Sequence, residues 1–403
     1  MPKQQSELAP AIGTPRRWLT LAISVAATSC AFLFINCGVF LIPALQTERH
    51  TSLAQAGLLS AMPSFGMVVT LIGWGYLVDR VGERWVLTAG LGLTAAAAFA
   101  AAPQRSLVAI GALMFVGGMA AASANTAGGR LVAGSFPADQ RGLAMGIRQT
   151  AQPLGVAIGA VALPELIEIE NGFFAALLYP AIACAVAALA CRVCLTDPPR
   201  PSHANASEEV ANPYRRSRTL QRIHLVSALL MVPQQVTITF MLVWLITEHR
   251  WSIPAASALV TVAQLLGALG RIVVGRWSDR AGSRMQPKRL IAVGCFFALA
   301  LLALNDYLNS PFTAAIMVFA AVTAVGYNGL AATAITEYGG PFWSGRALGV
   351  QNTCQRLTAA VTPPAFGALI TVAGYPFAFG ACAVCALAAI PLVPVSAERI
   401  DSN

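Results

Sequence analysis

The chain has 403 residues, of which 57% are hydrophobic and only 11% carry a charged side chain. Soluble domains usually contain about 25% charged residues. So few charges cannot cover the surface of a water-soluble protein of this size. The composition therefore predicts an integral membrane protein.

Apolar runs rich in Ala, Leu, Val and Gly recur along the whole chain. A helix needs about 20 residues to cross a hydrocarbon core of about 30 Å, and the runs lack the period-two alternation of a membrane barrel. We expect twelve transmembrane helices, at residues 18–42, 53–74, 85–102, 107–130, 143–163, 173–196, 223–246, 255–275, 289–307, 312–336, 345–367 and 375–395.

The first run follows the basic stretch "PRRW". No A-x-A-like cleavage site follows a short apolar core, so we expect a retained helix and no cleaved signal peptide.

Most Lys and Arg residues fall on one side of the expected helices, the side of the amino terminus, and Arg49, Arg105 and Arg250 fall on the other. The positive-inside rule then predicts that both termini are cytoplasmic. We interpret the net charge of +9 as a topology signal and contact with anionic lipid, with no nucleic-acid partner.

The longest connection, residues 197–222, is rich in Pro, Ser, Asn and mixed charges. It has no apolar face, so we expect a cytoplasmic linker with little fixed structure. It divides the chain into a six-helix half at residues 1–196 and a second six-helix half at residues 223–403.

Two motifs occur once in each half. "GYLVDRVGERW" (Gly75–Trp85) is echoed by "GRWSDRAGSRM" (Gly275–Met285), and "GIRQTAQ" (Gly146–Gln152) is echoed by "GVQNTCQ" (Gly349–Gln355). Both pairs fall at equivalent places, after the second expected helix and near the start of the fifth. Two matches in register indicate duplicated halves.

The repeated pattern G-x-L-x-D-R-x-G-x-R resembles the signature loop of the major facilitator superfamily of secondary transporters. The stretch "RGLAMGIRQTAQPLG" is also similar to bacterial members of that superfamily. The resemblance covers the whole chain and implies an all-α integral membrane fold of two pseudo-symmetric six-helix bundles. It also implies a central cavity that opens alternately to each side, with the substrate near the bilayer midplane.

The charges of the repeated loop suggest a gating role. Asp79 can accept backbone N–H bonds at the amino terminus of a neighbouring helix, or it can pair with Arg130. We hypothesise that Asp79 latches its half to the start of the eleventh helix and that Asp279 does the same toward the fifth. The alternative is a solvated, positive-inside turn. The expected gating residues are Asp79, Arg80, Gly75, Gly82, Arg84, Arg130, Arg148, Asp279, Arg280, Gly275, Gly282 and Arg284.

The charges expected inside the membrane are basic. No Asp or Glu falls in the core of an expected helix, whereas Arg356, Arg148 and Arg271 lie within helices or at their ends. A guanidinium group in a low-dielectric cavity binds a carboxylate bidentately. We therefore expect an anionic substrate. Any proton coupling would need another group, such as the boundary carboxylate Glu337, or a proton carried by the substrate.

Each arginine has an alternative role. Arg271 can support the signature loop from the helix end, and Arg148 can act as a gate between the bundles. Arg356 is the best substrate candidate, and its alternative is hydrogen bonding to unwound carbonyls near Pro363 and Pro364. The pattern R-x-x-x-G-x-x-x-D-R from Arg271 to Arg280 also resembles monocarboxylate and oxalate carriers, which implies a substrate-binding role for Arg271. The resemblance is partial, because Gly267 stands where some of those carriers have Asp.

Several polar residues sit where they could line the cavity. Such side chains also join helices to one another, so each has a structural alternative. The expected substrate-binding residues are Arg356, Arg271, Asn352, Gln355, Tyr327, Asn328, Gln234, Gln235, Asn36 and Gln264.

Other chemistries lack support in the sequence. The C-x-x-C pairs Cys191/Cys194 and Cys382/Cys385 lie in apolar runs without His or acidic ligands nearby, so we expect neither a metal site nor a cofactor. There is no G-x-x-x-x-G-K-[ST] phosphate loop. No nucleophile arrangement supports an enzyme, and a channel gives no reason for duplicated loops.

We therefore expect a monomeric carrier in a bacterial cytoplasmic membrane that moves a small organic anion, such as a mono- or dicarboxylate. Proton-coupled efflux of drugs or metabolites stays open as the alternative, because Pro153, Gly155 and Gly159 form a looser version of a run found in such exporters. The direction of transport and the coupling ion also stay open.

Overall fold

The computed structural model describes residues 13–42, 45–46, 51–167, 172–198 and 212–400. Within these ranges the chain forms helices and turns and no strand. The expected all-α membrane fold is confirmed. The described residues divide into two compact units, and each is described separately.

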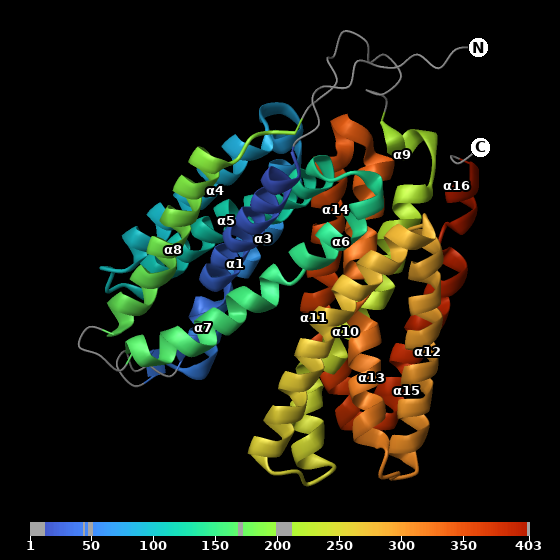
Figure 1. Ribbon diagram of the computed structural model, residues 1–403. Helices are drawn as coiled ribbons and strands as arrows, with labels where there is room; N and C mark the ends of the chain where they lie inside the picture. The colour runs from blue at the N-terminus through green and yellow to red at the C-terminus, as the bar shows by residue number, and fades with distance from the viewer. Residues whose placement is uncertain (1–12, 43–44, 47–50, 168–171, 199–211, 401–403) are drawn as a thin grey trace, which may run out of the picture. The chain divides into compact units, whose positions relative to one another are not determined.

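Unit 1 comprises residues 1–137, 151–211 and 341–346. Its helices are drawn from blue to green in Figure 1. They are α1 (Thr14–Phe40), α3 (Leu53–Val81), α4 (Glu83–Ala101), α5 (Leu107–Ser135), α7 (Ala151–Ile167) and α8 (Gly172–Cys194).

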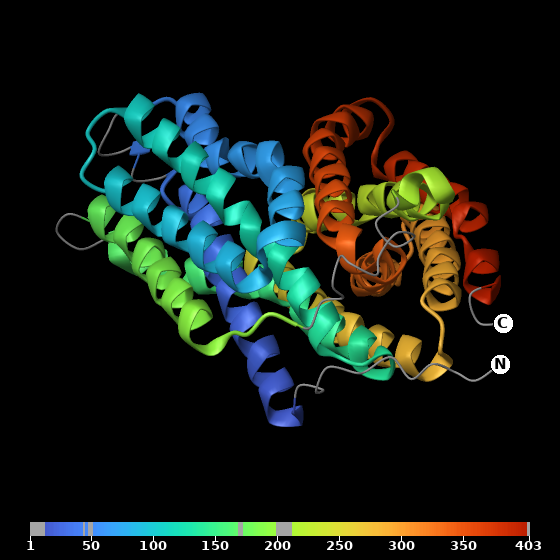
Figure 2. The same cartoon turned by 90° about the horizontal axis from the view of Figure 1, so that it is seen from above.

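Unit 2 comprises residues 138–150, 212–340 and 347–403. Its long helices are α10 (Thr219–Thr247), α11 (Ile253–Ala281), α12 (Met285–Tyr307), α13 (Thr313–Val325), most of α14 (Asn328–Ala373) and α15 (Tyr375–Ala389). Shorter elements are α6 (Ala138–Arg148), α9 (Pro213–Arg216), the 3-10 turn η2 (Ile390–Leu392) and α16 (Val395–Ile400). In Figure 2, α12 runs beside α15 in this unit.

Eleven stretches of the described residues are long and apolar enough to cross a membrane. One of them, Thr313–Ala373, is 61 residues long. At 1.5 Å per residue this exceeds twice the thickness of a hydrocarbon core of about 30 Å. The helix is interrupted at Gly340, whose φ of 64° and ψ of −179° are not helical. This stretch therefore contains both the tenth and the eleventh expected helices.

Two boundaries differ from the expected ones. The fifth expected helix, 143–163, consists of α6 and α7, separated by a turn at Gln149 and Thr150. The expected linker contains α9 and the first turn of α10, where Arg222 donates to the carbonyls of Pro391 and Leu392. Composition alone missed this order, because these polar residues are fixed by contacts with a distant segment.

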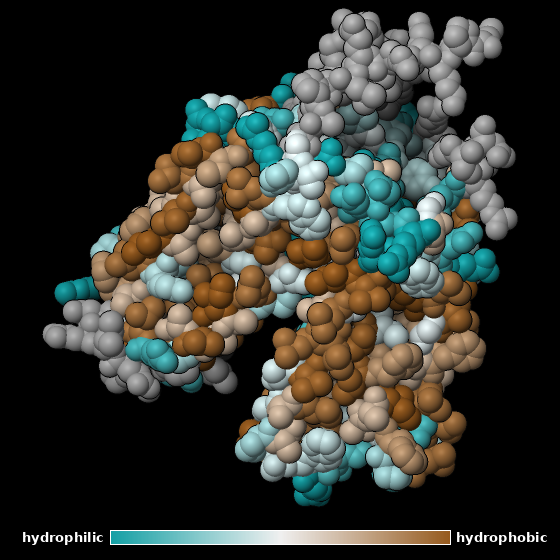
Figure 3. All heavy atoms as spheres, viewed as in Figure 1, coloured by the Kyte–Doolittle hydropathy of each residue, from teal (hydrophilic) through white to brown (hydrophobic). Residues whose placement is uncertain are grey.

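The outward surfaces of the long helices are apolar, as expected for contact with lipid. In Figure 3, brown apolar residues cover the sides of the helices and teal polar residues gather near helix ends. On α8 the exposed residues Val186, Leu189 and Val193 recur at helical spacing, and each is more than 60% exposed. Such a stripe is favourable only where hydrocarbon covers it.

Small residues bring the helices of unit 1 into close contact. A Cβ on Gly66 would collide with the carbonyl of Phe115, and one on Gly118 would collide with the carbonyl of Pro63. The two glycines thus allow α3 and α5 to pack backbone to backbone, as small residues do in membrane helices. This packing fixes α3, which ends in the first motif loop, against α5, which carries Arg130.

Candidate functional site

Asp79 is the centre of a buried charged cluster in unit 1. Its carboxylate accepts N–H bonds from the backbones of Gly345 and Arg346 at 2.9 and 3.0 Å. The Arg346 Nε also donates to it, at 3.0 Å, and the Arg130 Nε lies 3.5 Å away. Arg130 pairs in addition with Glu83 at 2.9 Å. We call Asp79, Glu83, Arg130 and Arg346 the Asp79 cluster.

Arg130 also holds the backbone around this cluster. Its guanidinium donates to the carbonyls of Val78 and Pro341, at 3.0 and 2.5 Å, and to the Ser344 hydroxyl at 3.0 Å. Only 7% of the Arg130 side chain and 2% of the Asp79 side chain are exposed. The pair therefore acts in a low-dielectric environment, where charge-assisted hydrogen bonds are strong.

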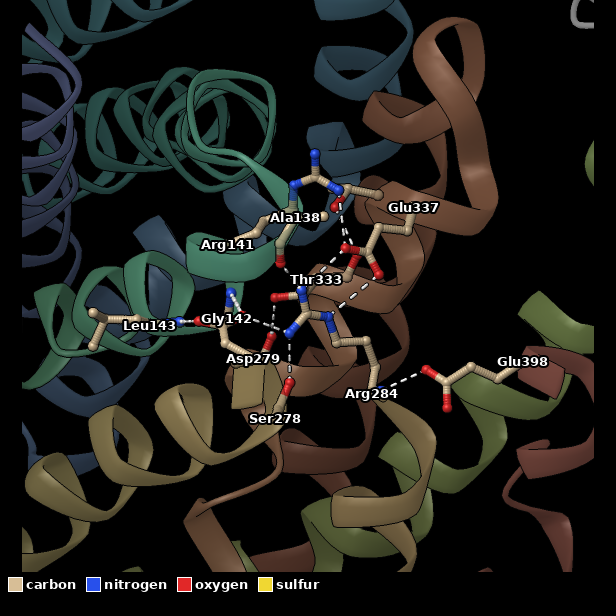
Figure 4. A network of polar contacts seen from close by, with 12 residues as sticks. Ala138, Arg141, Gly142, Leu143, Ser278, Asp279, Arg284, Thr333, Glu337 and Glu398 are labelled. Atoms are coloured by element: carbon tan, nitrogen blue, oxygen red, sulfur yellow. Dashed lines mark hydrogen bonds and ion pairs between the residues drawn. The ribbon is translucent and has the colours of Figure 1, made fainter. Parts of the chain in front are cut away.

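Asp279 occupies the equivalent position in unit 2 (Figure 4). Its carboxylate accepts N–H bonds from Gly142 and Leu143, both at 2.8 Å. The Arg284 guanidinium pairs with Asp279 at 2.6 Å and with Glu337 at 3.4 Å. Glu337 also pairs with Arg141 at 2.9 Å. We call Asp279, Arg284, Glu337 and Arg141 the Asp279 cluster.

The carboxylates of this cluster determine the charge of Arg284. Burial alone would lower the pKa of its guanidinium, but Glu337 and Asp279 raise that pKa above its ordinary value. The two carboxylates therefore favour the cationic form of Arg284.

The backbone contacts of the two clusters are related by the sequence repeat. A Cβ on Gly75 would collide with the carbonyl of Gly345, and one on Gly345 with the carbonyl of Gly75. Gly275 and Gly142 form the same reciprocal pair in unit 2. The arginine partners of the two carboxylates are not related by the repeat. Asp79 pairs with Arg130 and Arg346, whereas Asp279 pairs with Arg284 of its own loop.

A second carboxylate holds the end of each motif loop. Asp197, after α8, accepts the backbone N–H of Arg84 at 2.7 Å. Glu398, on α16, accepts those of Arg284 and Met285 at 2.5 and 3.1 Å and also contacts the Ser283 hydroxyl. Each acid therefore lies at the amino terminus of the following helix, α4 or α12, where a negative charge is stabilising.

Four expected substrate-binding residues form one polar network in unit 2. Asn328 donates to Gln234 at 3.0 Å and accepts from Gln355 at 3.1 Å. Gln355 also reaches the Tyr327 hydroxyl at 3.5 Å. We call Gln234, Tyr327, Asn328 and Gln355 the polar network.

Arg271 is buried on α11, and only 8% of it is exposed. Its NH1 donates to the Gln149 carbonyl at 3.1 Å, and its Nε has no hydrogen-bond partner among the described residues. No carboxylate in the described part of the chain forms an ion pair with it. Its charge is therefore balanced by no protein group there.

Comparison with known proteins agrees with this architecture. The model of the Major Facilitator Superfamily matches residues 23–363. The chain belongs to the major facilitator superfamily. It is 58% identical, over 384 residues, to an uncharacterized MFS-type transporter of Mycobacterium tuberculosis, an alignment that covers 95% of this chain and 86% of that protein.

Solved superfamily structures share the fold across nearly the whole chain. A proton:xylose symporter superposes with a TM-score of 0.75 at 14% identity, covering 94% of this chain and 95% of the other. A human organic anion transporter superposes with a TM-score of 0.72 at 16% identity, covering 94% of this chain and 99% of the other. This protein is therefore a multi-pass membrane transporter of the superfamily and not an enzyme.

The other expected gating residues lie around the two clusters. Arg80 and Arg280 are exposed, and Arg80 stacks on Tyr76. Arg84 donates to the Arg192 carbonyl at the end of α8. Gly82 and Gly282 both have positive φ, 114° and 59°, which lets the loops turn sharply. Arg148 is buried at the end of α6.

The other expected substrate residues are distributed over both units. Asn36, in unit 1, donates to the Phe32 carbonyl of its own helix at 2.8 Å. Gln264 lines a small pocket between α10, α11 and α13. Gln235, Asn352 and Arg356 are half-buried in unit 2.

Sequence reasoning missed a buried amine. Lys288 precedes the ninth expected helix, at 289–307, but it is the fourth residue of α12 and is fully buried. The sequence held one signal for it, because Lys288 is one of only two lysines in the chain.

No group of three or more His, Cys, Asp or Glu residues that could hold a metal ion occurs in the described part of the chain. The nine cysteines are all free thiols in this structure.

Proposed function

We propose that this transporter moves a small organic anion, a mono- or dicarboxylate, by alternating access. The proposal rests on one observation, the buried guanidinium of Arg271 without a carboxylate partner among the described residues. Burying an unpaired charge is costly, so such a group is retained where a ligand completes the pair.

The contrast with other buried arginines supports this role. Arg130 and Arg284 each contact two carboxylates of the protein. Those groups are neutralised by the protein and serve its structure. Arg271 keeps donor capacity for a carboxylate, which a planar guanidinium binds in a bidentate manner.

The surroundings of Arg271 favour the same class of substrate. The pattern R-x-x-x-G-x-x-x-D-R from Arg271 to Arg280 is similar to monocarboxylate and oxalate carriers, although Gly267 departs from some of them. The polar network supplies neutral donors and acceptors in the same unit, and Arg356 follows Gln355 directly in the chain. We assign Arg356 as the second cationic contact.

The shared fold does not select the substrate. A proton:xylose symporter and a human organic anion transporter both superpose on this chain at identities below 25%. Fold alone is not evidence of cargo. The substrate class is therefore inferred from the residues of this chain.

The two motif clusters would provide the gate. The Asp79 cluster holds residues 341–346 in unit 1, and the Asp279 cluster holds residues 138–150 in unit 2. Each segment is flanked in the chain by residues of the other unit. We propose that forming and releasing these contacts changes which side of the membrane the substrate site faces.

The cellular setting follows from the charge distribution. We propose a bacterial cytoplasmic membrane, with both termini and both motif loops in the cytoplasm, because the basic residues gather on that side. We further propose that the carrier functions as a monomer, with one substrate site.

Ligand-dependent thermal stabilisation of the purified protein tests the substrate class. The panel is lactate, oxalate, succinate, xylose, glutamine and the cationic drug ethidium. A ligand that binds only the folded protein raises its melting temperature with concentration. The proposal predicts stabilisation by at least one carboxylate, and stabilisation by ethidium alone would contradict it and favour drug efflux.

Arg271→Gln tests the residue. Removing a charge-assisted hydrogen bond costs about 1.5–3 kcal/mol, so the affinity for the stabilising carboxylate should fall about 10- to 150-fold. Arg276→Gln is the matched control, because Arg276 is exposed on the same helix. Equal affinities in the two variants would remove Arg271 from the site.

A further inference from the structure

The basic residues of this chain are almost all arginine. The sequence contains 26 Lys and Arg residues, and only Lys3 and Lys288 are lysines. Arginine keeps its proton under all conditions relevant to proteins, whereas a desolvated lysine can release it. Lys3 lies outside the described residues. Lys288 is therefore the only lysine in the described part of the chain, and it is buried.

The Lys288 amine is enclosed by neutral groups. Its side chain is 0% exposed, and its Nζ donates to the Ser227 hydroxyl at 3.0 Å and to the Ile223 carbonyl at 3.4 Å. The ring of Tyr327 lies 5.9 Å from the Nζ. No carboxylate forms an ion pair with Lys288 in the described ranges.

The elements around Lys288 carry few charges, and the acids are already engaged. Glu398 of α16 holds the backbone at the start of α12, and Asp279 of α11 holds Arg284. The other titratable groups with described side chains on the packed elements are Arg222 and His224 on α10, Tyr327 before α14, Arg271, Arg276 and Arg280 on α11, Tyr375, Cys382 and Cys385 on α15, and Arg289, Cys295, Asp306 and Tyr307 on α12 itself. Asp306 lies at the opposite end of α12, where it contacts His249 and Trp244.

This environment accommodates both forms of the amine. The charged form donates to Ser227 and Ile223, as the structure shows. Ser227 now donates its hydroxyl proton to the Ile223 carbonyl at 2.7 Å. After the amine loses its proton to water, that hydroxyl can rotate and donate to the nitrogen lone pair.

A polar route leads from this region toward the amino-terminal end of α10. His224 lies one turn before Ser227 on α10. Its two ring nitrogens contact Gln351 at 2.7 Å and the Tyr214 hydroxyl at 2.9 Å. Burial, with a smaller contribution from Cys354, raises the pKa of Tyr214 to about 12, so this hydroxyl keeps its proton. Tyr214 borders an open polar pocket with Arg215, Ser217, Arg218 and Gln221.

In the other direction Lys288 reaches the polar network. The Tyr327 hydroxyl donates to the Ser227 carbonyl at 3.1 Å, and Gln355 contacts the same hydroxyl. Ser227 and Tyr327 therefore connect Lys288 to residues proposed to hold the substrate.

We propose that Lys288 is the proton-binding site that couples a proton to transport, exchanging with water through His224 and Tyr214. This inference rests on the proposed transport function but not on the anionic substrate. It names the proton as the coupling ion and Lys288 as the group that binds it, in place of a membrane carboxylate.

Lysine NMR tests proton binding without any substrate. The Lys3→Arg variant contains one lysine, so protein labelled with ¹³C,¹⁵N-lysine gives one side-chain signal, from Lys288. The proposal predicts that this signal changes from the charged to the neutral form within about pH 5 to 9, as desolvated lysines do. A signal that stays in the charged form over that range would overturn the proposal.

The effect of pH on the conformation of the protein, measured without a substrate, tests coupling. Spin labels at Arg105→Cys and Ile253→Cys, in a background without native cysteines, report the distance between the two units by pulsed electron resonance. A ligand shifts a conformational equilibrium only by binding its states unequally. The ratio of distance populations should change at least about threefold between pH 5 and 9 in the parent.

Two variants make the result specific. The Lys288→Met side chain is always neutral and the Lys288→Arg side chain is always charged, so both variants should lose the pH response. Arg289→Gln changes an exposed neighbour and should keep the pH response of the parent. A pH response in the folded Lys288→Met protein equal to the parent's, or none in the parent, would overturn coupling through Lys288. Absence of carboxylate binding would instead count against the anion proposal and leave these results unchanged.

Discussion

Asp79 and Asp279 each accept two backbone N–H bonds from a segment far away in sequence. Guanidinium groups also approach both carboxylates. A buried carboxylate satisfied in this way has few alternatives, because removing either partner leaves a desolvated charge. At the scale of single residues, these two acids set the stability of the segments they hold.

Asp79→Asn and Asp279→Asn should release different segments. An amide offers one acceptor oxygen in place of two charged ones, so one backbone N–H of each pair loses its partner. Amide hydrogen exchange should accelerate about 10- to 100-fold at residues 341–346 in Asp79→Asn and at residues 138–150 in Asp279→Asn. Peptide-resolved mass spectrometry measures both.

The exposed motif arginines provide the controls for this pair. Arg80→Gln and Arg280→Gln change the same loops without touching either carboxylate, so exchange at both segments should stay at the parental rate. Acceleration of both segments in each Asp variant would show general loosening and contradict separate roles for the two clusters.

The residues of the candidate site were predictable to different degrees. Asp79 could be singled out from the repeated motif, and Arg130 from its place at the end of an apolar run, because charges are rare in this sequence. The contact of Asp79 with Gly345 joins residues 266 positions apart and depends on tertiary packing. Lys288 lies at the edge of an apolar run, where hydropathy cannot distinguish a buried amine from one in water.

At the scale of elements, glycine pairs set the approach of the helices that carry the motifs. Gly75 and Gly345 meet backbone to backbone in unit 1, and Gly275 and Gly142 do so in unit 2. Two other glycines on neighbouring parts of these units make no such contact. Gly73 in α3 and Gly294 in α12 have open space where a Cβ would lie.

Alanine substitution should therefore separate the two kinds of glycine. Gly75→Ala and Gly275→Ala place a methyl group against a carbonyl, which should lower the melting temperature and weaken the carboxylate contacts one turn away. Gly73→Ala and Gly294→Ala should leave stability unchanged or raise it by up to about 1 kcal/mol, because alanine favours a helix. Thermal denaturation followed with a thiol-reactive dye compares the four, and equal losses at Gly73 and Gly75 would refute the packing argument.

The sequence supports the elements better than their boundaries. Each apolar run of about 20 residues predicts a helix because the bilayer permits little else. The turn at Gln149 and Thr150 was not predictable from hydropathy, because it interrupts an apolar run. The break at Gly340 falls between the tenth and eleventh expected helices, and its positive φ suits glycine.

At the scale of the whole molecule, the two units repeat the same motif contacts but differ in their other polar residues. The motif carboxylates and glycine pairs repeat, whereas Arg271, Lys288 and the polar network belong to unit 2. Each unit therefore carries its own set of motif contacts, whereas the residues proposed for recognition are concentrated in unit 2. The sequence repeat alone would not predict this difference, because it covers the motif loops and not Arg271 or Lys288.

Uptake of a radiolabelled carboxylate by proteoliposomes tests the central claim most directly. The compound is the carboxylate that stabilises the purified protein best. The account predicts saturable uptake by the parent and by Arg276→Gln, and a rate at subsaturating substrate about 10- to 150-fold lower for Arg271→Gln. Uptake by Arg271→Gln at the parental rate, or transport of a cationic drug with no uptake of any carboxylate, would contradict it.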